Sequence, residues 1–508
     1  MSEIEKTKSG LSRRDFLKTG GLVAAAIQVS GIAGAALAAG KDKDSYTGYE
    51  SWEGEQQTFN RKKYELDEVP YKKTGEVRRP GRYTDLVFIR AGIFGQALAE
   101  GWTKEDGVDA LGEPLASWYK ENPSQLELDI ERETVVLPNA AKDHQKYDEY
   151  FVLADAYAFG WEDIFAFYPA EPTAPPEVSD YQMVVATPVG PHEKPFREEP
   201  VPFKSEDHAA ELIKKIAHRY GATIVGITKL NPDFCYDMGL RGSPDPGPWD
   251  PPEHWEYAIV MGVPHEWEQV LSNPAHGTSY DGYNRVRNAS GRLASFLKHL
   301  GYPARSHHPP FHYDLVVPPI AVDAGLGQTG RHGFTIIPET GSNIRLAVVT
   351  TNVPMTVDKP IDFGVADFCN DCKICAEQCP SGAISFDDSP EGMEIRGYEH
   401  WFIDTAKCFN FWMQAMGPLG CRLCLTVCPY TQRSNWIHNA AKTIDINDPT
   451  GLVNNSLVYM QKNFFDAPEV TEYLRPPDGR FAGYREAPEW LQVTNWFDIN
   501  PLNPQIGE

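Results

Sequence analysis

The chain has 508 residues, 41% of them apolar and 12% aromatic, with a formal net charge of −24 at pH 7. This length exceeds the usual size of one hydrophobic core, so we expect two or three packed units with room to enclose a cofactor. The acidic balance repels phosphate backbones and anionic head groups, which argues against a nucleic acid as substrate and against electrostatic membrane binding.

The N-terminus carries Ser12-Arg13-Arg14-Asp15-Phe16-Leu17-Lys18, then a Gly/Ala-rich apolar run and Ala36-Leu37-Ala38. This pattern predicts a twin-arginine export signal over residues 1–38 with a small-residue cleavage site. A membrane anchor or an amphipathic helix is the alternative, but the run is Gly-rich and too short to span a bilayer comfortably. Removing residues 1–38 takes away five basic and three acidic side chains, so the net charge falls from −24 to −26.

Nine cysteines in an exported protein would ordinarily indicate disulfides. Here Cys235 stands alone, and we expect it to be a small packed hydrophobe. The other eight form two runs that each close with Cys-Pro, namely Cys369-x2-Cys372-x2-Cys375-x3-Cys379-Pro380 and Cys408-x12-Cys421-x2-Cys424-x3-Cys428-Pro429. This spacing predicts a two-cluster 4Fe-4S ferredoxin pattern and disfavours zinc knuckles and disulfides, because zinc motifs do not share a fourth ligand reciprocally.

In such a pattern the first three thiolates of a run wrap one cubane, and the fourth ligates the other cluster. We therefore expect one cluster on Cys369, Cys372, Cys375 and Cys428, and the other on Cys379, Cys408, Cys421 and Cys424. The long insertion Phe409–Gly420 either packs against another domain, shielding a cluster, or is an ordinary packed loop. Two adjacent clusters pass one electron at a time, and a twin-arginine signal suits a protein that must receive them before export.

Upstream of the cysteines, residues 39–204 show few periodic stretches and are expected to be irregular, wrapped over a core. Ser205 followed by acidic residues predicts a helix N-cap, and Gly221 predicts that helix's end. Further expected elements are strands at Ala222–Thr228, Tyr257–Val263 and Asn343–Thr350, a Pro/Gly-rich loop at 241–252, and a helix between Tyr283 and Gly301.

Three features of this region are candidates for a site. Tyr283 lies on the apolar stripe of its helix and is expected to point inward, and composition alone favours a core tyrosine with a satisfied hydroxyl over a site residue. Arg345 is the only cation in an apolar strand and is expected to be paired. The loop Gly325–Gly333 allows close backbone approach to a large cofactor, but its spacing matches no nucleotide-binding fingerprint.

Together, the export signal, Gly325-Leu326-Gly327-Gln328, Asn343-Ile344-Arg345-Leu346, Asp358–Gly364 and the two cysteine runs resemble the respiratory reductive dehalogenases. The resemblance spans the signal and residues from about 205 to 440, and it is weak from 39 to 200. It implies an α+β fold, with a nitroreductase-like corrinoid-binding core followed by a ferredoxin-like domain. The implied units are a signal at 1–38, an N-terminal region at 39–204, a corrinoid-binding domain at 205–355, a two-cluster domain at 356–440 and a C-terminal extension at 441–508.

The resemblance also implies the chemistry. Reduced Co(I) of a cobalamin-type corrinoid removes halide from a small organohalide, and the clusters restore that state in two one-electron steps. The chain lacks the Asp-x-His-x-x-Gly signature, so a base-off corrinoid is implied. Tyr283 corresponds to the family's proton donor and Arg345 to its partner, because a nearby arginine favours the phenolate. The residues expected near the corrinoid are Gly325, Gly327, Gln328, Gly330, His307 and His308, and either histidine is alternatively a loop cap.

By the same resemblance, the protein is the terminal reductase of anaerobic organohalide respiration. It would lie peripherally on the outer face of the cytoplasmic membrane, which is the periplasmic side in a Gram-negative cell. Its partners would be a small integral membrane anchor protein and a quinone-linked electron donor, with no nucleic acid and with a homodimer left open. The identity of the organohalide cannot be read from the sequence.

Two other functions compete with this interpretation. An exported two-cluster electron-transfer subunit would need no corrinoid, and a corrinoid absorbance spectrum would distinguish it. The epoxyqueuosine reductases share a corrinoid and two clusters but act on a modified tRNA base. An RNA enzyme needs a basic surface, whereas this chain is acidic and carries an export signal.

Overall fold

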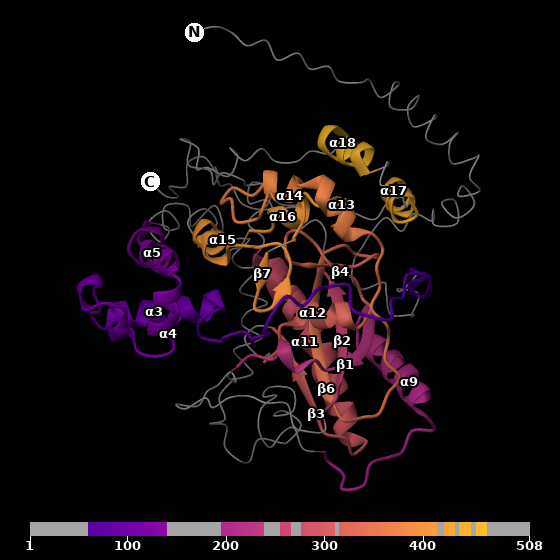
Figure 1. Cartoon of the computed structure of the whole chain (residues 1–508). Helices are drawn as coiled ribbons and strands as arrows, with labels where there is room; N and C mark the ends of the chain where they lie inside the picture. The colour runs from indigo at the N-terminus through magenta and orange to yellow at the C-terminus, as the bar shows by residue number, and fades with distance from the viewer. Residues whose placement is uncertain are drawn as a thin grey trace, which may run out of the picture.

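In a computed structural model of the chain, the structure describes residues 59–139, 195–237, 255–265, 276–309, 314–391, 393–413, 421–431, 436–448 and 454–464. The export signal and the loop expected at 241–252 lie outside these residues, as does most of the C-terminal extension. The order of elements along the chain is shown in Figure 1.

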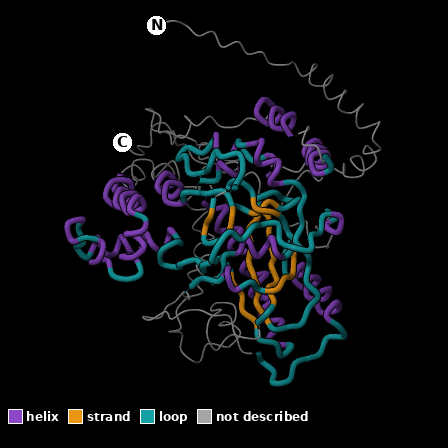
Figure 2. Tube along the Cα trace, viewed as in Figure 1, coloured by secondary structure: helices purple, strands orange, loops and turns teal. Residues whose placement is uncertain are grey.

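The centre of the molecule is a four-stranded antiparallel sheet with strand order β1-β2-β6-β3. Figure 2 shows these strands in the middle, with helices around them. The predicted strands are confirmed within two residues at each end, and β3 was not foreseen. The strands are β1 (Ile224–Lys229), β2 (Tyr257–Pro264), β3 (Ala304–His307) and β6 (Ile344–Thr351).

Both faces of this sheet are covered by helices. Helices α9 (Glu206–Arg219) and α11 (His276–His299) share one apolar core with strand residues such as Ile259 and Val349. Helix α12 (Val317–Asp323) packs on the other face, against residues such as Val260 and Val348. Because successive strand residues point to opposite faces, every residue of β2 is buried.

The two long helices differ in how well the sequence predicts them. The Ser205 hydroxyl accepts a hydrogen bond from the His208 amide at 3.1 Å, and Gly221 follows the helix with φ +105°, so the predicted α9 is confirmed. Helix α11 begins at His276 rather than near Tyr283. Tyr283 therefore lies inside the helix, because the polar first turns of α11 have no apolar periodicity to reveal them.

The N-terminal region is not uniformly irregular, and this part of the prediction is wrong. Residues 64–80 do run extended across the core, pairing Glu65 with Ile361 and Lys73 with Tyr398. Beyond them the chain forms a helical unit with its own apolar core, which includes Phe94 and Tyr119. Its elements are η1 (Arg61–Lys63), α3 (Val87–Ala99), η2 (Lys104–Asp106), η3 (Val108–Leu111), α4 (Leu115–Glu121), α5 (Pro123–Glu131) and η4 (Arg132–Val136). Most of these helices are too short for a periodic pattern to stand out, and the longer α3 is apolar along most of its length, so that no polar face alternates with an apolar one.

The cysteine-rich part consists of short helices gathered at one end of the molecule (Figure 1). The helices are α13 (Val365–Cys372), α14 (Ile374–Glu377), α15 (Thr405–Phe411), α16 (Leu423–Thr426), η9 (Pro429–Thr431), α17 (Trp436–Ile446) and α18 (Asn454–Phe464). The remaining short elements are η6 (Pro232–Phe234), β4 (Gln328–Thr329), β5 (Thr335–Ile336), β7 (Glu394–Ile395) and β8 (Tyr398–Glu399).

This mixture of helices and one main antiparallel sheet confirms the α+β class. The sheet falls within the predicted residues 205–355, and helices α13 to α16, which carry cysteines, fall within 356–440. Helices α17 and α18 extend beyond residue 440, and the domain boundaries themselves stay predictions. Cys235 is buried in the apolar core, as expected. Within the described ranges, no helix combines the length and the hydropathy needed to cross a bilayer.

Candidate functional site

The first set of cysteines gathers between α13, α14 and the segment after α16. Cys369 and Cys372 lie on α13, Cys375 lies on α14, and Cys428 precedes η9. Burial raises the pKa of the Cys369 thiol to about 12, and Cys428 raises it further. Burial also raises the pKa of Cys375 well above its ordinary value, with Cys369 and Cys428 as the next causes. The thiolates are therefore costly here unless bound metal stabilises them.

The second set gathers around α15 and α16. Burial raises the pKa of Cys408 to about 11, with Cys379 as the next cause. Burial raises the pKa of Cys421 to about 12, and both Cys408 and Cys379 contribute further. The structure thus brings together the same two sets that the reciprocal pattern predicts, each with one cysteine from the other run. Their roles as cluster ligands stay a prediction.

All eight cysteines are free thiols. In the described part of the chain, no three His, Cys, Asp or Glu side chains converge closely enough to hold a single metal ion. A cubane does not need such convergence, because its four cysteines each bind a different iron atom at the corners of the cluster. Each set of four neighbouring, partly buried cysteine sulfurs therefore fits a 4Fe-4S cluster.

Tyr283 and Arg345 lie together at one end of the sheet. The Arg345 guanidinium carbon is 4.5 Å from the centroid of the Tyr283 ring. Arg345 lies near the start of β6, opposite Val263 at the end of β2. The structure thus brings this predicted pair into contact, with the arginine over the ring face.

A glycine in α11 allows this approach. A Cβ on Gly282 would lie 2.7 Å from His265 Cε1 and 3.3 Å from Arg345 Cβ. A larger residue would therefore require the His265 ring to move. Gly282 was missed from the sequence, because a glycine inside a helix gives no indication of what approaches it.

Two buried polar atoms beside the pair have no hydrogen-bond partner among the described residues, Asn343 Oδ1 and Arg345 Nε. The Asn343 amide is held in place, since its Nδ2 donates to the His265 carbonyl at 3.1 Å. Buried polar groups are normally satisfied, so an unpartnered acceptor and donor at one place fit a polar ligand.

Arg422 is a second cation beside Tyr283, and sequence reasoning missed it. Its Nη2 donates a hydrogen bond to Ser279 Oγ in α11. Burial lowers the pKa of Arg422 to about 9, with the positive charge of Arg345 as the next cause, while Tyr283 and Cys424 raise it. Arg422 therefore lies between the Tyr283–Arg345 pair and the second set of cysteines. The available signal was a single arginine between Cys421 and Cys424 in an otherwise apolar segment.

The glycines of the loop expected to contact a cofactor are explained by close packing within the chain itself. Gly325 has φ +66°, and a Cβ on it would lie 2.2 Å from the Lys359 carbonyl oxygen. A Cβ on Gly327 would lie 2.0 Å from the Ile336 carbonyl oxygen, and one on Gly330 would lie 2.6 Å from Ile336 Cδ1. Any corrinoid contact of these three glycines stays a prediction.

Gln328, in the same loop, also has partners within the chain. Its Oε1 accepts hydrogen bonds from the amides of Phe363 at 2.8 Å and Val365 at 3.4 Å. It therefore satisfies amides at the N-terminus of α13. A corrinoid contact of Gln328 also stays a prediction.

The two candidate histidines are buried in and beside β3. His307 Nε2 lies 3.0 Å from Thr350 Oγ1, and burial together with the charges of Arg305 and Arg82 lowers its pKa well below 6.5. His308 Nδ1 lies 3.0 Å from Ser306 Oγ. His307 is opposite Val348, three residues along β6 from Arg345, or about 10 Å. Both histidines belong to a buried polar network at the sheet edge, and their cofactor role stays a prediction.

Comparison with known families matches two segments of the chain. Residues 368–431 match the 4Fe-4S dicluster domain, and residues 10–30 match the twin-arginine translocation pathway signal sequence. The predicted export signal is therefore confirmed, and so is the assignment of the cysteine runs to a dicluster domain.

Among curated proteins, the chain is 32% identical over 265 residues to the tetrachloroethene reductive dehalogenase of Sulfurospirillum multivorans, covering 45% of this chain and 52% of that protein. It is 30% identical over 287 residues to a tetrachloroethene reductive dehalogenase of Desulfitobacterium hafniense, covering 47% and 51%. The matches thus span about half the length of these relatives.

Among solved structures, the fold matches the catabolic reductive dehalogenase NpRdhA in complex with 3-bromo-4-hydroxybenzoic acid. The TM-score is 0.58 at 22% sequence identity, and the match covers 81% of this chain and 50% of that one. The matched share of this chain is much larger than the dicluster segment alone.

Proposed function

We propose that the chain is a reductive dehalogenase, which removes halide from a small organohalide with electrons passed through two 4Fe-4S clusters to a corrinoid. The observation that carries the proposal is the contact between Arg345 and Tyr283, with Arg422 joining that pair to a cluster cysteine segment. A bare electron-transfer subunit has no need for a half-buried tyrosine stacked on an arginine with a second, buried arginine beside them.

The position of Arg422 supports an order for electron transfer. Because Arg422 lies between Cys421 and Cys424 and interacts with Tyr283 and Arg345, the second cysteine set is the one beside the site. Cys424 also interacts with Cys428 of the first set, so the two sets adjoin. Electrons would then enter at the first cluster and leave from the second.

The net reaction takes an organohalide, two electrons and one proton to the hydrogenated carbon and free halide. A corrinoid, when bound, supplies the reduced cobalt that receives the cluster electrons and breaks the carbon–halogen bond. The Tyr283 hydroxyl gives the proton to the carbon and is reprotonated from solvent. Arg345 and Arg422 place two positive charges where phenolate and halide develop negative charge.

The unpartnered atoms of Asn343 and Arg345 fit a corrinoid at this site. A corrin ring carries amide side chains at its rim, which both donate and accept hydrogen bonds. Asn343 Oδ1 would accept from such an amide, and Arg345 Nε would donate to one. These two residues are the chain's own candidates for holding the cofactor.

Export by the twin-arginine route is supported by the matched signal. We propose that the protein then lies peripherally on the outer face of the cytoplasmic membrane, held by a small integral membrane anchor protein and supplied by a quinone-linked donor. The acidic chain would itself be repelled by anionic head groups, so a partner would have to provide the attachment.

Metal analysis and halide release together test this function. Protein made anaerobically in a corrinoid-replete host should contain about eight irons and about one cobalt per chain. It should release chloride or bromide from at least one member of a panel of chlorinated alkenes, chlorinated alkanes and halogenated phenols. About eight irons without cobalt, and no halide from any compound, would favour the electron-transfer subunit instead.

A further inference from the structure

Arg331 lies in a tight turn of the glycine-rich loop and points into the cysteine-rich part. The turn is closed by a hydrogen bond from the Gly333 amide to the Gly330 carbonyl at 2.9 Å, and the Gly330 amide donates to the Phe334 carbonyl at 3.0 Å. Although it sits in a loop, Arg331 is only 1% exposed. It is among the largest fully buried side chains of the described chain, so its surroundings must account for its charge.

The guanidinium group of Arg331 is held entirely by backbone carbonyls. Nε and Nη2 both donate to the Cys369 carbonyl, at 3.1 and 2.8 Å. Nη1 donates to the Ser385 carbonyl at 2.9 Å and to the Asp387 carbonyl at 2.6 Å. Its Cζ lies 4.9 Å from the centroid of the Trp401 ring. The N–H donors of Arg331 are thus satisfied by neutral carbonyl acceptors, and its guanidinium group also lies over the face of the Trp401 ring.

Carbonyls satisfy hydrogen bonds but do not neutralise the charge. Within the described ranges no carboxylate forms an ion pair with Arg331, whereas the similarly buried Arg82, Arg90 and Arg132 each have one. A buried charge without a counterion is strongly unfavourable. A cluster held by four thiolates is an anion, and Cys369 is a member of the first cysteine set.

The same loop contacts α13 at two places. Gln328 Oε1 accepts from the Val365 amide at the start of α13, and Arg331 binds the Cys369 carbonyl farther along it. Helix α13 carries Cys369 and Cys372. The glycines that let this loop approach the chain closely therefore also place a fixed positive charge beside the first cluster.

We propose that Arg331 is the internal counter-charge of the first cluster and raises its reduction potential, because a fixed positive charge favours the more negative reduced cluster. The inference rests on the clusters of the proposed function but not on corrinoid or on dehalogenation. Arg331 is a positioning and electrostatic residue, and it takes no part in bond cleavage. The glycine-rich loop thereby sets the driving force for electron entry.

The test is an EPR-monitored redox titration of the two clusters in the full-length protein, without substrate. Arg331→Gln removes the charge but keeps two N–H donors, and Arg331→Lys keeps the charge but loses the planar fork. We expect Arg331→Gln to reduce the equilibrium constant for reduction of one cluster at least tenfold, which is 59 mV for one electron. Arg331→Lys should restore most of this change.

Lys72→Gln is the matched control, because its cation is 65% exposed and pairs with Glu399 at the surface. This variant should leave both potentials unchanged. If Arg331→Gln assembles no first cluster but Arg331→Lys does, the requirement for charge is supported. The inference is overturned if Arg331→Gln leaves the reduction potentials of both clusters unchanged, or if Arg331→Gln and Arg331→Lys shift a potential by the same amount. It is also overturned if neither of these two variants assembles the first cluster. Absence of iron from the wild-type protein would instead refute the proposed function.

Discussion

Arg422 donates a hydrogen bond from Nη2 to Ser279 Oγ, which joins a cysteine segment to the helix of the candidate proton donor. Ser279 and Tyr283 are four residues apart in α11 and therefore lie on the same face of the helix. Arg422 thus contacts the turn of α11 that carries Tyr283, while its neighbours Cys421 and Cys424 belong to the second cysteine set. This contact physically connects the cysteine-rich part with the candidate active site.

Replacement of Arg422 by lysine should lower kcat/KM for halide release by about tenfold to a hundredfold. Lysine keeps the charge but loses the fixed fork geometry, and one charge-assisted hydrogen bond contributes about 1.5–3 kcal/mol. Steady-state kinetics measures the loss, and the iron content should stay at the wild-type value. In a double-mutant cycle with Ser279→Ala, the two effects should be strongly non-additive. Fully additive effects would show that the hydrogen bond does not couple the two segments.

Replacement of Tyr283 by phenylalanine should reduce turnover about a hundredfold or more, because loss of a positioned general acid typically costs that much. Cobalt and iron content should be unchanged, since the ring that packs against Arg345 is retained. Tyr302→Phe is the matched control, because the Tyr302 hydroxyl donates only to the Val201 carbonyl, away from the pair. Full activity in Tyr283→Phe would remove this residue from the proposed role.

The reciprocal assignment of cysteines predicts which pairs of substitutions damage one cluster and which damage both. Cys372 and Cys428 belong to the same expected cluster although they come from different runs. A Cys372→Ser, Cys428→Ser double variant should therefore retain about four irons and one EPR signal. A Cys424→Ser, Cys428→Ser double variant should lose both signals, although both cysteines come from one run. The opposite pattern would mean that each run binds its own cluster.

The sequence predicts the parts of this protein whose signals are local. The cysteine spacing is a short covalent pattern, and Ser205, Gly221 and the apolar stripe of α11 each identify a helix terminus or a buried helix face. The pair Tyr283 and Arg345 was identified by family resemblance, since composition alone favours a core tyrosine with a satisfied hydroxyl.

What the sequence does not show are contacts between distant segments. Arg422 is 143 residues from Ser279, and nothing near either residue indicates the other. The need for a glycine at position 282 is seen only in the structure, where His265 and Arg345 lie against it. The glycine-rich loop shows the same limit: the sequence indicates a close backbone approach, and only the structure shows that Lys359 and Ile336 of the chain itself approach these glycines.

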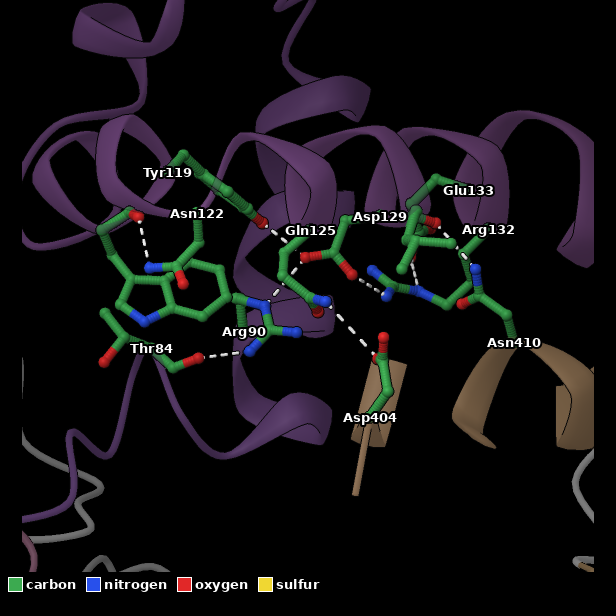
Figure 3. A network of polar contacts seen from close by, with 12 residues as sticks. Thr84, Arg90, Tyr119, Asn122, Gln125, Asp129, Arg132, Glu133, Asp404 and Asn410 are labelled. Carbon is green, nitrogen blue, oxygen red and sulfur yellow. Dashed lines mark hydrogen bonds and ion pairs between the residues drawn. The ribbon is translucent and has the colours of Figure 1, made fainter. Parts of the chain in front are cut away.

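Asp129 should be essential to the stability of the N-terminal helical unit. Its carboxylate accepts hydrogen bonds from Arg90 Nε at 2.8 Å and the Tyr119 hydroxyl at 2.7 Å, and it also pairs with Arg132 (Figure 3). Asp129→Ala leaves the buried Arg90 guanidinium without its carboxylate and leaves Arg132 paired only with Glu133. We expect it to lower the free energy of unfolding of this unit by about 3–5 kcal/mol, measured by urea unfolding followed by tryptophan fluorescence.

This loss should extend to the second cysteine set. Helix α15 carries Cys408 and is attached to α5 by a hydrogen bond from Asn410 Nδ2 to the Leu128 carbonyl at 2.8 Å. Loosening α5 should therefore make the cluster that includes Cys408 easier to remove with a chelator. The control is Glu127→Gln, whose pair with Lys104 is exposed and should contribute less than about 1 kcal/mol. Equal stability of the two variants would contradict a structural role for Asp129.

His332 should make the folded protein sensitive to mild acid. Burial lowers the pKa of His332 to about 4, against 6.5 for a free side chain. A lowered folded-state pKa means that its contribution to stability is fully present above pH 6.5 and is lost as the pH falls toward 4, by on the order of 3 kcal/mol in all. His332→Gln, which cannot titrate, should show a shallower loss of unfolding free energy between pH 7 and pH 5 in urea titrations.

Asp323 titrates in the same range with the opposite sign. Burial raises its pKa to about 6, so its stabilising contribution is lost as the pH rises. Because Asp323 is present in both proteins, the difference between the two pH profiles isolates His332, and identical slopes would show that the imidazole takes up protons freely in the folded state.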